Sequence, residues 1–528
     1  MSVRIKTGSE FADRLFHRVK SFLEHDTLNI RIDGKSIRGY RSPDSRAIWI
    51  RDYSDMMRGF KYFETDLTST VEHFAETQAQ NGRIFDYFTT FPEKLPCERE
   101  NWTKYVRVPV EADVEYRFVK ATYLAWQATG DDTWMENLLP QMEKALNYVL
   151  SHPWRWDKTH QLIKRAYTID TWDFAYTAGK HPWLQFQIDK NTFWGIFHGD
   201  NSGYYEAFLL LAKLYNYFNQ TGKSHFWQEQ AETLKNKLNK ISWNGRFYTH
   251  FVKLTPVEIP GVDEKTQLSL SNPMAINRGV TTHKMAVSII SEYLRRKEQR
   301  NLAYEWFSID PPFPDGIFGD EKLVAGAYIN GGIFPLAGGE LARAAFEHGF
   351  EEYGVDILKR YYHLIAQSGE TYLWYFPDGR PSSVETSTSP EAMPTDGWGS
   401  SAMLYALVEG LAGIQDQHKQ FEKLSLSPRW SAAGILKADV EVGYKASHTH
   451  VGYNYQLNGD NLTLMVKAAQ AEVSFHILLP AAKTATQVLI NKKPVSFQVT
   501  FVEKSRYADF KALIRGKATV RIHLKAKD

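Results

Sequence analysis

The sequence predicts a mainly α-helical domain followed by an antiparallel β domain. From about residue 50 to 415, apolar residues recur at helical spacing in successive segments, joined by loops rich in Trp, Tyr, Gly and Pro. After about residue 418, apolar and polar residues alternate in short segments with turns such as Asn458-Gly459-Asp460 between them. A length of 528 residues allows one large domain with an appended module. We therefore expect a helical domain at 1–417, with a lead-in at 1–40, and a β-sandwich at 418–528.

Two helical segments show the pattern most clearly. Residues 115–126 place apolar side chains at helical spacing and end at Thr129-Gly130-Asp131, which is a helix-end signal. Residues 204–218 are apolar nearly all round, so this helix should be buried on more than one side. Further helices are expected at 66–79, 139–151, 227–240, 281–296, 339–353, 354–367 and 399–414. Because no repeat of fixed period is visible, a solenoid of standard units is not expected.

The C-terminal segments have the alternation typical of antiparallel strands with one face in a core. Strands are expected at 436–442, 448–457, 462–468, 472–479, 487–491 and 520–524. Pro428 and the Ser-rich stretch around it mark the boundary with the helical domain.

Composition excludes several kinds of site. The 63 basic and 61 acidic residues leave a net charge of +2, which disfavours nucleic acid and anionic membranes as partners. The single cysteine, Cys97, excludes an internal disulfide and a thiolate metal site, and we expect no metal or cofactor. No apolar run is long enough for a signal peptide or a bilayer span. We expect a cytoplasmic protein, or a periplasmic one if a signal peptide has been removed.

Asp173 is the first candidate for a catalytic residue. It lies in Tyr167-Thr-Ile-Asp170-Thr-Trp172-Asp173-Phe-Ala-Tyr176, among aromatic rings. A carboxyl group held against rings is poorly solvated, which would raise its pKa and suit it to donate a proton near neutral pH. Since sugar rings stack on aromatic faces, this segment favours carbohydrate chemistry. The alternative is a helix start with Asp170 as N-cap.

Two further segments contain candidate sugar-binding residues. Trp49, Arg51 and Asp52 combine a stacking ring with a donor and an acceptor for neighbouring hydroxyl groups. The alternative is a surface ion pair between Arg51 and Asp52, with Trp49 in the core. Asp113 stands beside Tyr116 in an acidic helix start, where it would serve either in a sugar subsite or as a helix cap.

These motifs occur in a characteristic order. Trp-x-Arg-Asp is followed by the acidic helix start, Thr-Trp-Asp, the apolar helix, the turn Asn330-Gly331-Gly332 and finally Gly397-Trp398-Gly399. Over residues 45–415 this order resembles the glycoside hydrolases with an (α/α)6-barrel catalytic domain. Closest are the amylo-1,6-glucosidase part of glycogen debranching enzymes, processing α-glucosidase and trehalase. The β module resembles those that follow the barrel in rhamnosidases and disaccharide phosphorylases.

The resemblance implies roles for individual residues. Thr171-Trp172-Asp173 is similar to the motif whose Asp is the general acid in these enzymes, so Asp173 inherits that role. Trp172 and Trp398 would help to hold the sugar, and residues 328–335 would line the barrel. The implied reaction is hydrolysis of an oligosaccharide, with an α-glucoside favoured, by an inverting mechanism.

The sequence departs from the family at the second carboxylate. A general base Glu is expected about twenty residues before Trp398, but Trp374 and Tyr375 stand there. An inverting enzyme needs its base about 6.5–9.5 Å from the acid, with water between them. Glu385, in a Ser- and Pro-rich loop, is the preferred candidate, although it would also suit a solvated loop. The other two candidates are Glu391 and Glu370, and Glu391 is also expected to contact substrate.

Other functions remain open at this stage. A glycoside phosphorylase would keep the acid and replace the base with a phosphate pocket. A lyase or sugar epimerase would need His or Tyr as base, and a non-catalytic relative would bind glycans without cleaving them. The sequence does not predict the sugar, linkage, anomer or oligomeric state.

Overall fold

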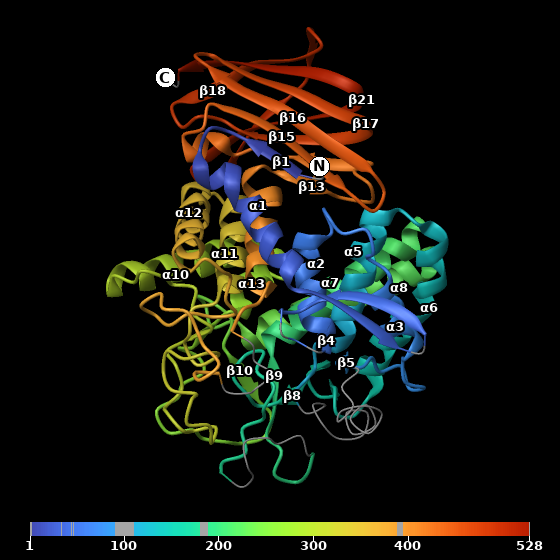
Figure 1. The fold of residues 1–528 in the computed structure, drawn as a ribbon, viewed down its shortest axis with the longest axis vertical. Helices are drawn as coiled ribbons and strands as arrows, with labels where there is room; N and C mark the ends of the chain where they lie inside the picture. Colours follow the sequence, from blue (N-terminus) through green and yellow to red (C-terminus); the bar gives the residue numbers. More distant parts are fainter. Residues whose placement is uncertain are drawn as a thin grey trace.

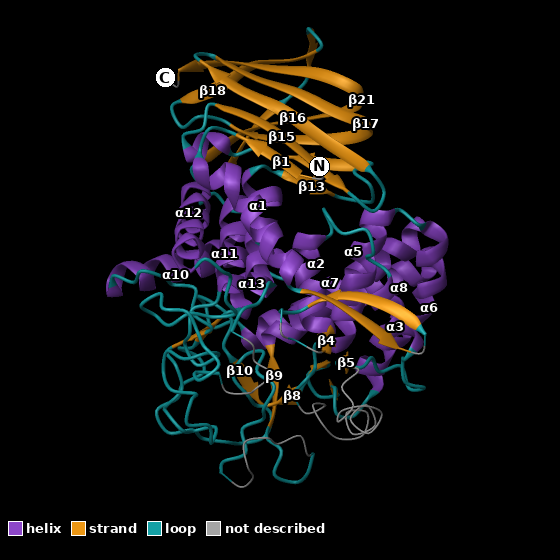
Figure 2. Ribbon diagram, viewed as in Figure 1, coloured by secondary structure: helices purple, strands orange, loops and turns teal. Residues whose placement is uncertain are grey.

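The protein consists of a helical layer and a large sheet that packs on one end of it (Figures 1 and 2). The structure, a computed structural model, describes residues 3–32, 34–43, 45, 47–89, 110–179, 188–387 and 394–526. Within these ranges, no helix has the length and apolar character needed to cross a membrane.

Six helices contact one another in cyclic order, and we call them the helix ring. They are α2 (Ile50–Phe60), α5 (Val114–Thr129), α7 (His198–Tyr217), α9 (Ser271–Asn277), α11 (Pro335–Glu347) and α13 (Trp398–Tyr405). Each packs on the next, and α13 packs on α2. The remaining described helices each pack on at least one of these six: α1 (Glu10–His25), α3 (Ser69–Glu76), α6 (Asp132–Ser151), α8 (Thr221–Ser242), α10 (His283–Arg300) and α12 (Glu351–Ser368).

Local sequence accounts for several helix ends. Helix α5 ends at Gly130, whose φ of 73° is left-handed, and Asp131 then caps α6 by accepting a 2.9 Å hydrogen bond from the amide of Trp134. The predicted helix end at Thr129-Gly130-Asp131 is therefore confirmed. Helix α7 is buried on several sides, as its apolar sequence predicts.

Several predicted helix boundaries are wrong. Helix α6 begins at Asp132 rather than at 139, and α8 spans Thr221–Ser242 rather than 227–240. The break between α11 and α12 lies at 348–350, where Gly349 has a φ of 84°, rather than at residue 354. The predicted helix 399–414 is α13 followed by a short π-helix, Ala406–Leu411.

One ten-stranded sheet forms the second layer. Its strands are β1 (Val3–Lys6), β13 (Ile414–Asp416), β14 (Lys423–Leu426), β15 (Lys437–Tyr444), β16 (Thr449–Asn458), β17 (Asn461–Leu478), β18 (Lys483–Ile490), β19 (Lys493–Val495), β20 (Gln498–Val502) and β21 (Ser505–Ala526). The pairs are antiparallel except for β14 with β17. This confirms a C-terminal, mainly antiparallel sheet.

Strand β17 joins two strands that the sequence predicts separately, at 462–468 and 472–479. The register with β21 shifts between Ala468 and Gln470, so a bulge interrupts the alternation without ending the strand. The first half of β17 pairs with β16 and the second half with β14. The predicted sandwich is thus one hydrogen-bonded sheet whose longest strands change neighbours along their length.

Both ends of the helical region also contribute strands to this sheet. Strand β1, from the lead-in, pairs with β15 through Val3 and Val442. Strand β13 begins at Ile414, ahead of the predicted boundary at 418. The sequence pattern misses both strands because they are only four and three residues long.

Short strands lead into the helix ring at the end away from the sheet (Figure 1). Strand β4 (Ala47–Trp49) runs directly into α2, β9 (Trp194–Phe197) into α7, and β11 (Leu268–Ser269) nearly into α9. The amino-terminal ends of these helices therefore share one end of the ring. The other short described strands are β2 (Thr27–Ile32), β3 (Lys35–Tyr40), β5 (Tyr87–Thr89), β6 (Trp156–Asp157), β7 (Leu162–Ile163), β8 (Arg165–Ala166), β10 (Phe251–Lys253) and β12 (Ile309–Asp310).

Candidate active site

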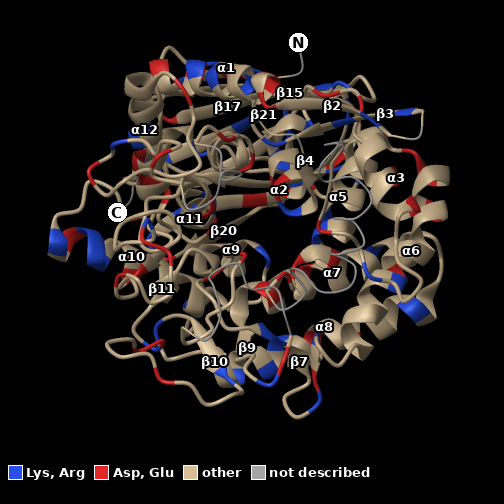
Figure 3. Ribbon diagram, turned by 60° about the horizontal axis from the view of Figure 1, so that its bottom comes forward, with Lys and Arg blue, Asp and Glu red and all other residues tan. Residues whose placement is uncertain are grey.

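Most of the predicted site residues stand at the amino-terminal ends of ring helices. Trp49 and Asp113 are the residues just before α2 and α5, and Trp398 is the first residue of α13. Arg51 and Asp52 lie in the first turn of α2. Figure 3, in which this end comes forward, shows α2, α5, α7, α9 and α11 around a common centre. Helix amino termini favour carboxylates, so this end suits a cluster of acidic residues.

Arg51 connects three carboxylates, and we call these four residues the Arg51 cluster. Its Nε and Nη2 donate to the two oxygens of Asp113 at 2.7 and 3.0 Å, and its Nη1 donates to Asp173 at 3.1 Å. Nη2 also forms an ion pair with Glu111. A guanidinium has five N–H groups, and most of those of Arg51 are directed at protein carboxylates. Arg51 therefore positions acids, rather than presenting a free fork to a sugar.

The three carboxylates differ in their access to solvent. The side chain of Asp173 is 30% exposed, whereas those of Asp113 and Glu111 are 3% and 2% exposed. Burial alone would raise the pKa of Asp113, but the charges of Arg51 and Arg117 outweigh it and hold that pKa below its usual value. Asp113 is thus a buried, fixed anion of the cluster, and Asp173 is its solvent-accessible member.

The helix-cap interpretation of Asp113 is not supported, because its side chain makes no capping hydrogen bond and faces Arg51 instead. The surface ion pair expected as the alternative for Arg51 and Asp52 is also wrong. Both side chains are buried and pair with other residues. Trp49 is buried, but it packs with Ala47 in a small cluster apart from the main core.

A second ion-pair group joins the predicted sugar-binding residues. Arg41 pairs with Asp52 at 3.2 Å and with Asp396, and its guanidinium lies 5.3 Å from the ring of Trp49. Asp396 accepts a 2.5 Å hydrogen bond from the backbone amide of Trp398. Arg41 and Asp396 therefore bring Trp49, Asp52 and Trp398 into one arrangement.

Sequence reasoning did not select Arg41 or Asp396. Asp396 carried a usable signal, since it lies two residues before Trp398 in the same motif. Arg41 carried none, because its partners are distant in sequence. The indole of Trp398 also donates to Asp55 at 2.8 Å, which ties the start of α13 to α2.

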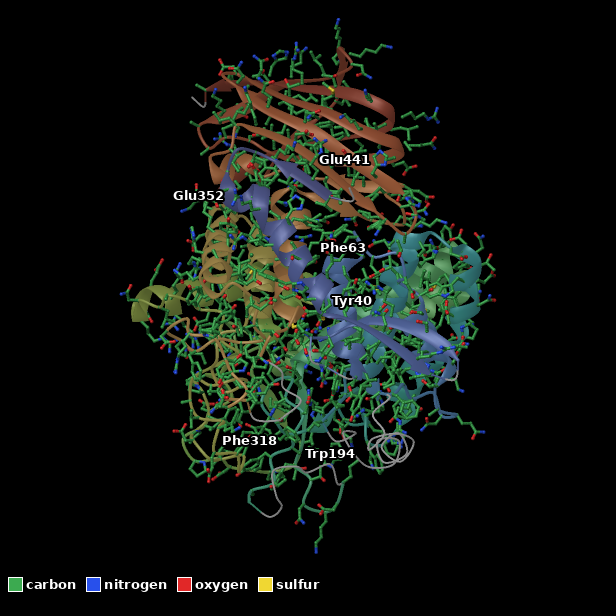
Figure 4. All side chains as sticks on the ribbon, in the orientation of Figure 1. Tyr40, Phe63, Trp194, Phe318, Glu352 and Glu441 are labelled. Atoms are coloured by element: carbon green, nitrogen blue, oxygen red, sulfur yellow. The ribbon has the colours of Figure 1, made fainter. Side chains whose placement is uncertain are left out.

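The Thr-Trp-Asp segment is a loop, so the alternative of a helix start with Asp170 as N-cap is wrong. Asp170 has a φ of 39°, and its buried carboxylate accepts a 2.8 Å hydrogen bond from the hydroxyl of Ser271. Burial raises the pKa of Asp170 to about 6. The ring of Trp172 packs edge-on against Phe318, which Figure 4 labels among the loops away from the sheet, with centroids 5.2 Å apart. These contacts hold the loop that presents Asp173.

Tyr328 is a further residue near Asp173, on the loop that the family resemblance places along the barrel. It has a left-handed φ of 44°, which is unusual for a bulky side chain. Burial, and then the charge of Asp173, raise the pKa of its phenol, so the hydroxyl remains a hydrogen-bond donor.

The structure does not bring the predicted base into this group. Glu385 is exposed on a turn, and a hydrogen bond with Ser383 lowers its pKa. Glu370 accepts a 2.9 Å hydrogen bond from the amide of Thr371, and Glu391 lies outside the described residues. The structure describes no hydrogen bond or ion pair from Glu385 or Glu370 to the Arg51 cluster.

The aromatic pair at the position expected for the base is part of the core. Trp374 and Tyr375 are 1% and 0% exposed. A carboxylate at either position would be buried. Among the residues that the structure describes, no group of three or more His, Cys, Asp and Glu side chains is arranged to hold a metal ion.

Several solved structures share this fold. The alpha-L-rhamnosidase from Dictyoglumus thermophilum gives a TM-score of 0.62 at 11% identity, over 99% of this chain and 50% of that one. The alpha-L-rhamnosidase from Streptomyces avermitilis, complexed with L-rhamnose, gives 0.60 at 11% identity, over 99% and 42%. The GH63 mannosylglycerate hydrolase from Thermus thermophilus gives 0.50 at 13% identity, over 75% and 99%. No protein-family model and no curated protein sequence matches the chain.

The chain spans half or less of the length of these two rhamnosidases. At this identity the likeness concerns the fold, which is one used by glycoside hydrolases. It agrees with the wider resemblance expected from the motifs. The narrower resemblance to debranching enzymes, processing α-glucosidase and trehalase is not supported by these structures.

Proposed function

We propose that this protein is a glycoside hydrolase in which Asp173 is the general acid. The observation that carries the proposal is the contrast within the Arg51 cluster, where Asp173 is 30% exposed and its two companion carboxylates are almost fully buried. The shared fold with alpha-L-rhamnosidases and a mannosylglycerate hydrolase supports a sugar substrate. The cyclic packing of the six ring helices supports an (α/α)6 barrel.

The proposed reaction begins with a sugar at the open end of the helix ring. Asp173 protonates the glycosidic oxygen as the bond to the leaving group breaks. Arg51 fixes the carboxyl group in place and then stabilises the carboxylate that remains after proton transfer. Asp52 and the rings of Trp49 and Trp398 would contact the sugar, with the phenol of Tyr328 as a further donor.

An inverting reaction also needs a base that activates water about 6.5–9.5 Å from the acid. Glu385 is the sequence-predicted base, but its described position is an exposed turn. It would serve only if that turn moved toward Asp173.

The substrate we propose is an oligosaccharide or simple glycoside. The α-glucoside expected from the motifs rests on sequence resemblance alone, and the similar structures add α-L-rhamnoside to the candidates. A panel of nitrophenyl glycosides that includes both sugars, with natural oligosaccharides, would identify the substrate. Anomer-resolved NMR of the first product would establish inversion or retention.

The test of the acid is Asp173→Asn. We expect turnover to fall by at least about 1,000-fold, because the variant cannot donate the proton, while sugar binding stays measurable. Asp378→Asn is the matched control, since Asp378 is 67% exposed and is not a member of the Arg51 cluster. Full activity in Asp173→Asn would contradict the assignment.

A glycoside phosphorylase on the same fold is the second candidate. It is favoured by one observation, that the position expected for the general base carries Trp374 and Tyr375, both buried in the core. Phosphate would then replace water as the nucleophile. Turnover that requires phosphate and yields a sugar phosphate would establish this reaction, and sugar binding without any product would establish a non-catalytic glycan-binding protein.

A further inference from the structure

A small pocket with four arginines lies outside the Arg51 cluster. It has a volume of about 270 Å³ and lies between the end of α10, the β11–β12 pair and the loop that follows α8. Figure 3 shows α10 and β11 next to each other. The lining residues are Arg246, Thr266, Arg295, Arg296, Gln299, Arg300, Asp310 and Pro311.

One of these arginines is a structural part of the wall. Arg296 is 9% exposed and donates to Glu292 at 2.9 Å, to Asp310 at 2.7 Å and to the carbonyl of Thr266 at 2.9 Å. Its donors are engaged on three sides, so it holds α10 against the β11–β12 pair and has little capacity left for a ligand.

The other three arginines are open to solvent. The side chains of Arg246, Arg295 and Arg300 are 58%, 43% and 47% exposed. Arg295 donates twice to Glu292, at 2.9 and 2.6 Å. Arg300 donates once, to Asp310 at 2.8 Å, and the nearest carboxylate oxygen to Arg246 is 3.7 Å away, on Glu292. Arg246 and Arg300 therefore retain most of their donors.

The charges of this group do not balance. Four guanidinium groups share two carboxylates, Glu292 and Asp310, and four minus two leaves two positive charges. Burial opposes ionisation of Glu292, yet hydrogen bonds from Arg295 and Arg296 lower its pKa, so it already serves as a counter-ion. Two guanidinium charges in excess of the carboxylates add no ion-pair stabilisation to the fold, so a purely structural role does not account for them.

Aromatic rings hold two of these arginines in place. The guanidinium of Arg246 lies 5.6 Å from the ring centroid of Phe247, and that of Arg300 lies 5.9 Å from the ring centroid of Phe307. Stacked guanidinium groups lose less freedom when they bind a planar or tetrahedral oxyanion. The Thr266 hydroxyl donates to the carbonyl of Asp263 at 2.8 Å, and the Gln299 carbonyl accepts from Arg295, so the NH2 group of Gln299 is the further donor among these two side chains.

We infer that this pocket binds an oxyanion with two negative charges or two neighbouring carboxylates. Arginine forks match the oxygens of sulfate, phosphate and carboxylate groups, and two added negative charges would neutralise the pocket. The anion is either free in solution or part of an acidic glycan. This inference does not depend on the proposed hydrolase activity.

The position of the pocket relates it to the candidate active site. Thr266, two residues before β11, and Asp310 of β12 line the pocket, and two residues after β11 Ser271 donates to Asp170 in the loop of Asp173. The pocket therefore lies on the same end of the helix ring as the Arg51 cluster.

The test is calorimetric titration of the full-length protein with sodium sulfate and sodium phosphate, at ionic strength kept constant with sodium chloride. We expect saturable binding that is at least tenfold weaker in Arg246→Ala/Arg300→Ala. Arg14→Ala is the matched control, because Arg14 is 65% exposed and lies on α1. Absence of saturable binding in the wild type, or equal binding in the double variant, would overturn the inference.

A second pair of titrations distinguishes the sources of the anion. Trigalacturonate that binds more tightly than sulfate, and loses affinity in the double variant, would identify an acidic glycan. Binding of the inorganic ions alone would identify a free anion. Maltotriose carries no charge, so its binding should be the same in the wild type and in the double variant. Release of sugar from a neutral glycoside by the double variant would show that its active site is intact.

Discussion

Each carboxylate of the Arg51 cluster has a fixed cation beside it, whereas Glu385 stands in solvent on a turn held together by Ser383, Thr386 and Ser387. The Arg51 cluster gathers residues from α2, from the segment just before α5 and from the loop before α7. The turn of Glu385 uses only neighbours in sequence. The contrast shows that charge pairing at buried helix ends fixes a side chain, while a polar turn leaves it free to change position.

Apart from changes to Asp173 itself, we expect replacement of the Arg51 guanidinium group to cause the largest loss of activity. Arg51→Lys keeps the positive charge but cannot hold Asp113 in two-point contact while also bonding Asp173. We expect kcat/KM for the glycosidic substrate to fall by about 100-fold, because a small displacement of Asp173 misaligns proton transfer. Arg4→Lys is the control, since Arg4 also pairs with two carboxylates, Asp439 and Glu441, but in the sheet. Equal activities of the two variants would contradict a positioning role for Arg51.

The ion pairs behind the cluster should govern stability. Arg117 is fully buried and pairs with Asp55 at 2.5 Å and Asp113 at 3.4 Å. Arg117→Ala leaves two buried anions without this partner and should lower the free energy of unfolding by about 3–5 kcal/mol. The exposed pair of Arg14 and Glu10 should contribute only about 0–1 kcal/mol, measured with Arg14→Ala. Urea denaturation of both variants would check this, and similar losses would refute it.

Two carboxylates at the start of α5, Asp113 just before the helix and Glu115 in its first turn, differ in their partners. Asp113 is held as an anion by Arg51, whereas Glu115 accepts hydrogen bonds only from the amide of Ile84 and the hydroxyl of Tyr204 among the contacts described. Burial raises the pKa of Glu115 from 4.5 to about 7. The folded protein therefore retains this proton up to about pH 7, whereas the unfolded chain loses it near pH 4.5.

The stabilising effect of protonated Glu115 is complete below pH 4.5 and is lost as the pH rises through about 7. Glu115→Gln removes this dependence. At pH 8 the variant should be more stable than the wild type by on the order of 3 kcal/mol, and at pH 4 the two should be similar. Urea denaturation at both pH values measures the difference. Parallel pH profiles would show that Glu115 does not titrate in this range.

The smallest effect is expected at the exposed turn. In its described position Glu385 contacts only its own turn, so Glu385→Gln should change kcat by no more than a few-fold. Glu370→Gln provides a comparison with the other described candidate. A loss of about 100-fold or more in Glu385→Gln alone would show that the turn closes over the ring and that Glu385 is the general base.

Much of the site was predictable because its residues occupy recognisable helix starts. Arg51, Asp52 and Asp113 stand where an apolar periodic segment begins, and Asp173 stands in a motif that a known family shares. The helix end at Gly130 was equally visible, since glycine alone adopts its left-handed backbone freely. Local sequence thus indicated the helix starts, and the family resemblance indicated Asp173 as the candidate acid.

Pairings between distant residues were not predictable. Arg41 reaches Asp396 across more than 350 positions, and β1 joins β15 across more than 430. Such contacts depend on how the helix ring closes and on where the sheet packs against it. The sequence around each residue predicts neither of these. The bulge in β17 shows the same limit, because one irregular residue made a single strand resemble two.

The most direct test of the account compares two leaving groups in Asp173→Asn. A dinitrophenyl glycoside departs without protonation, whereas an alkyl glycoside of the same sugar needs an acid. If Asp173 is the general acid, the variant should lose at least about 1,000-fold in kcat/KM on the alkyl glycoside and less than about tenfold on the dinitrophenyl glycoside. Equal losses on both substrates would contradict the central claim and assign Asp173 to binding or folding instead.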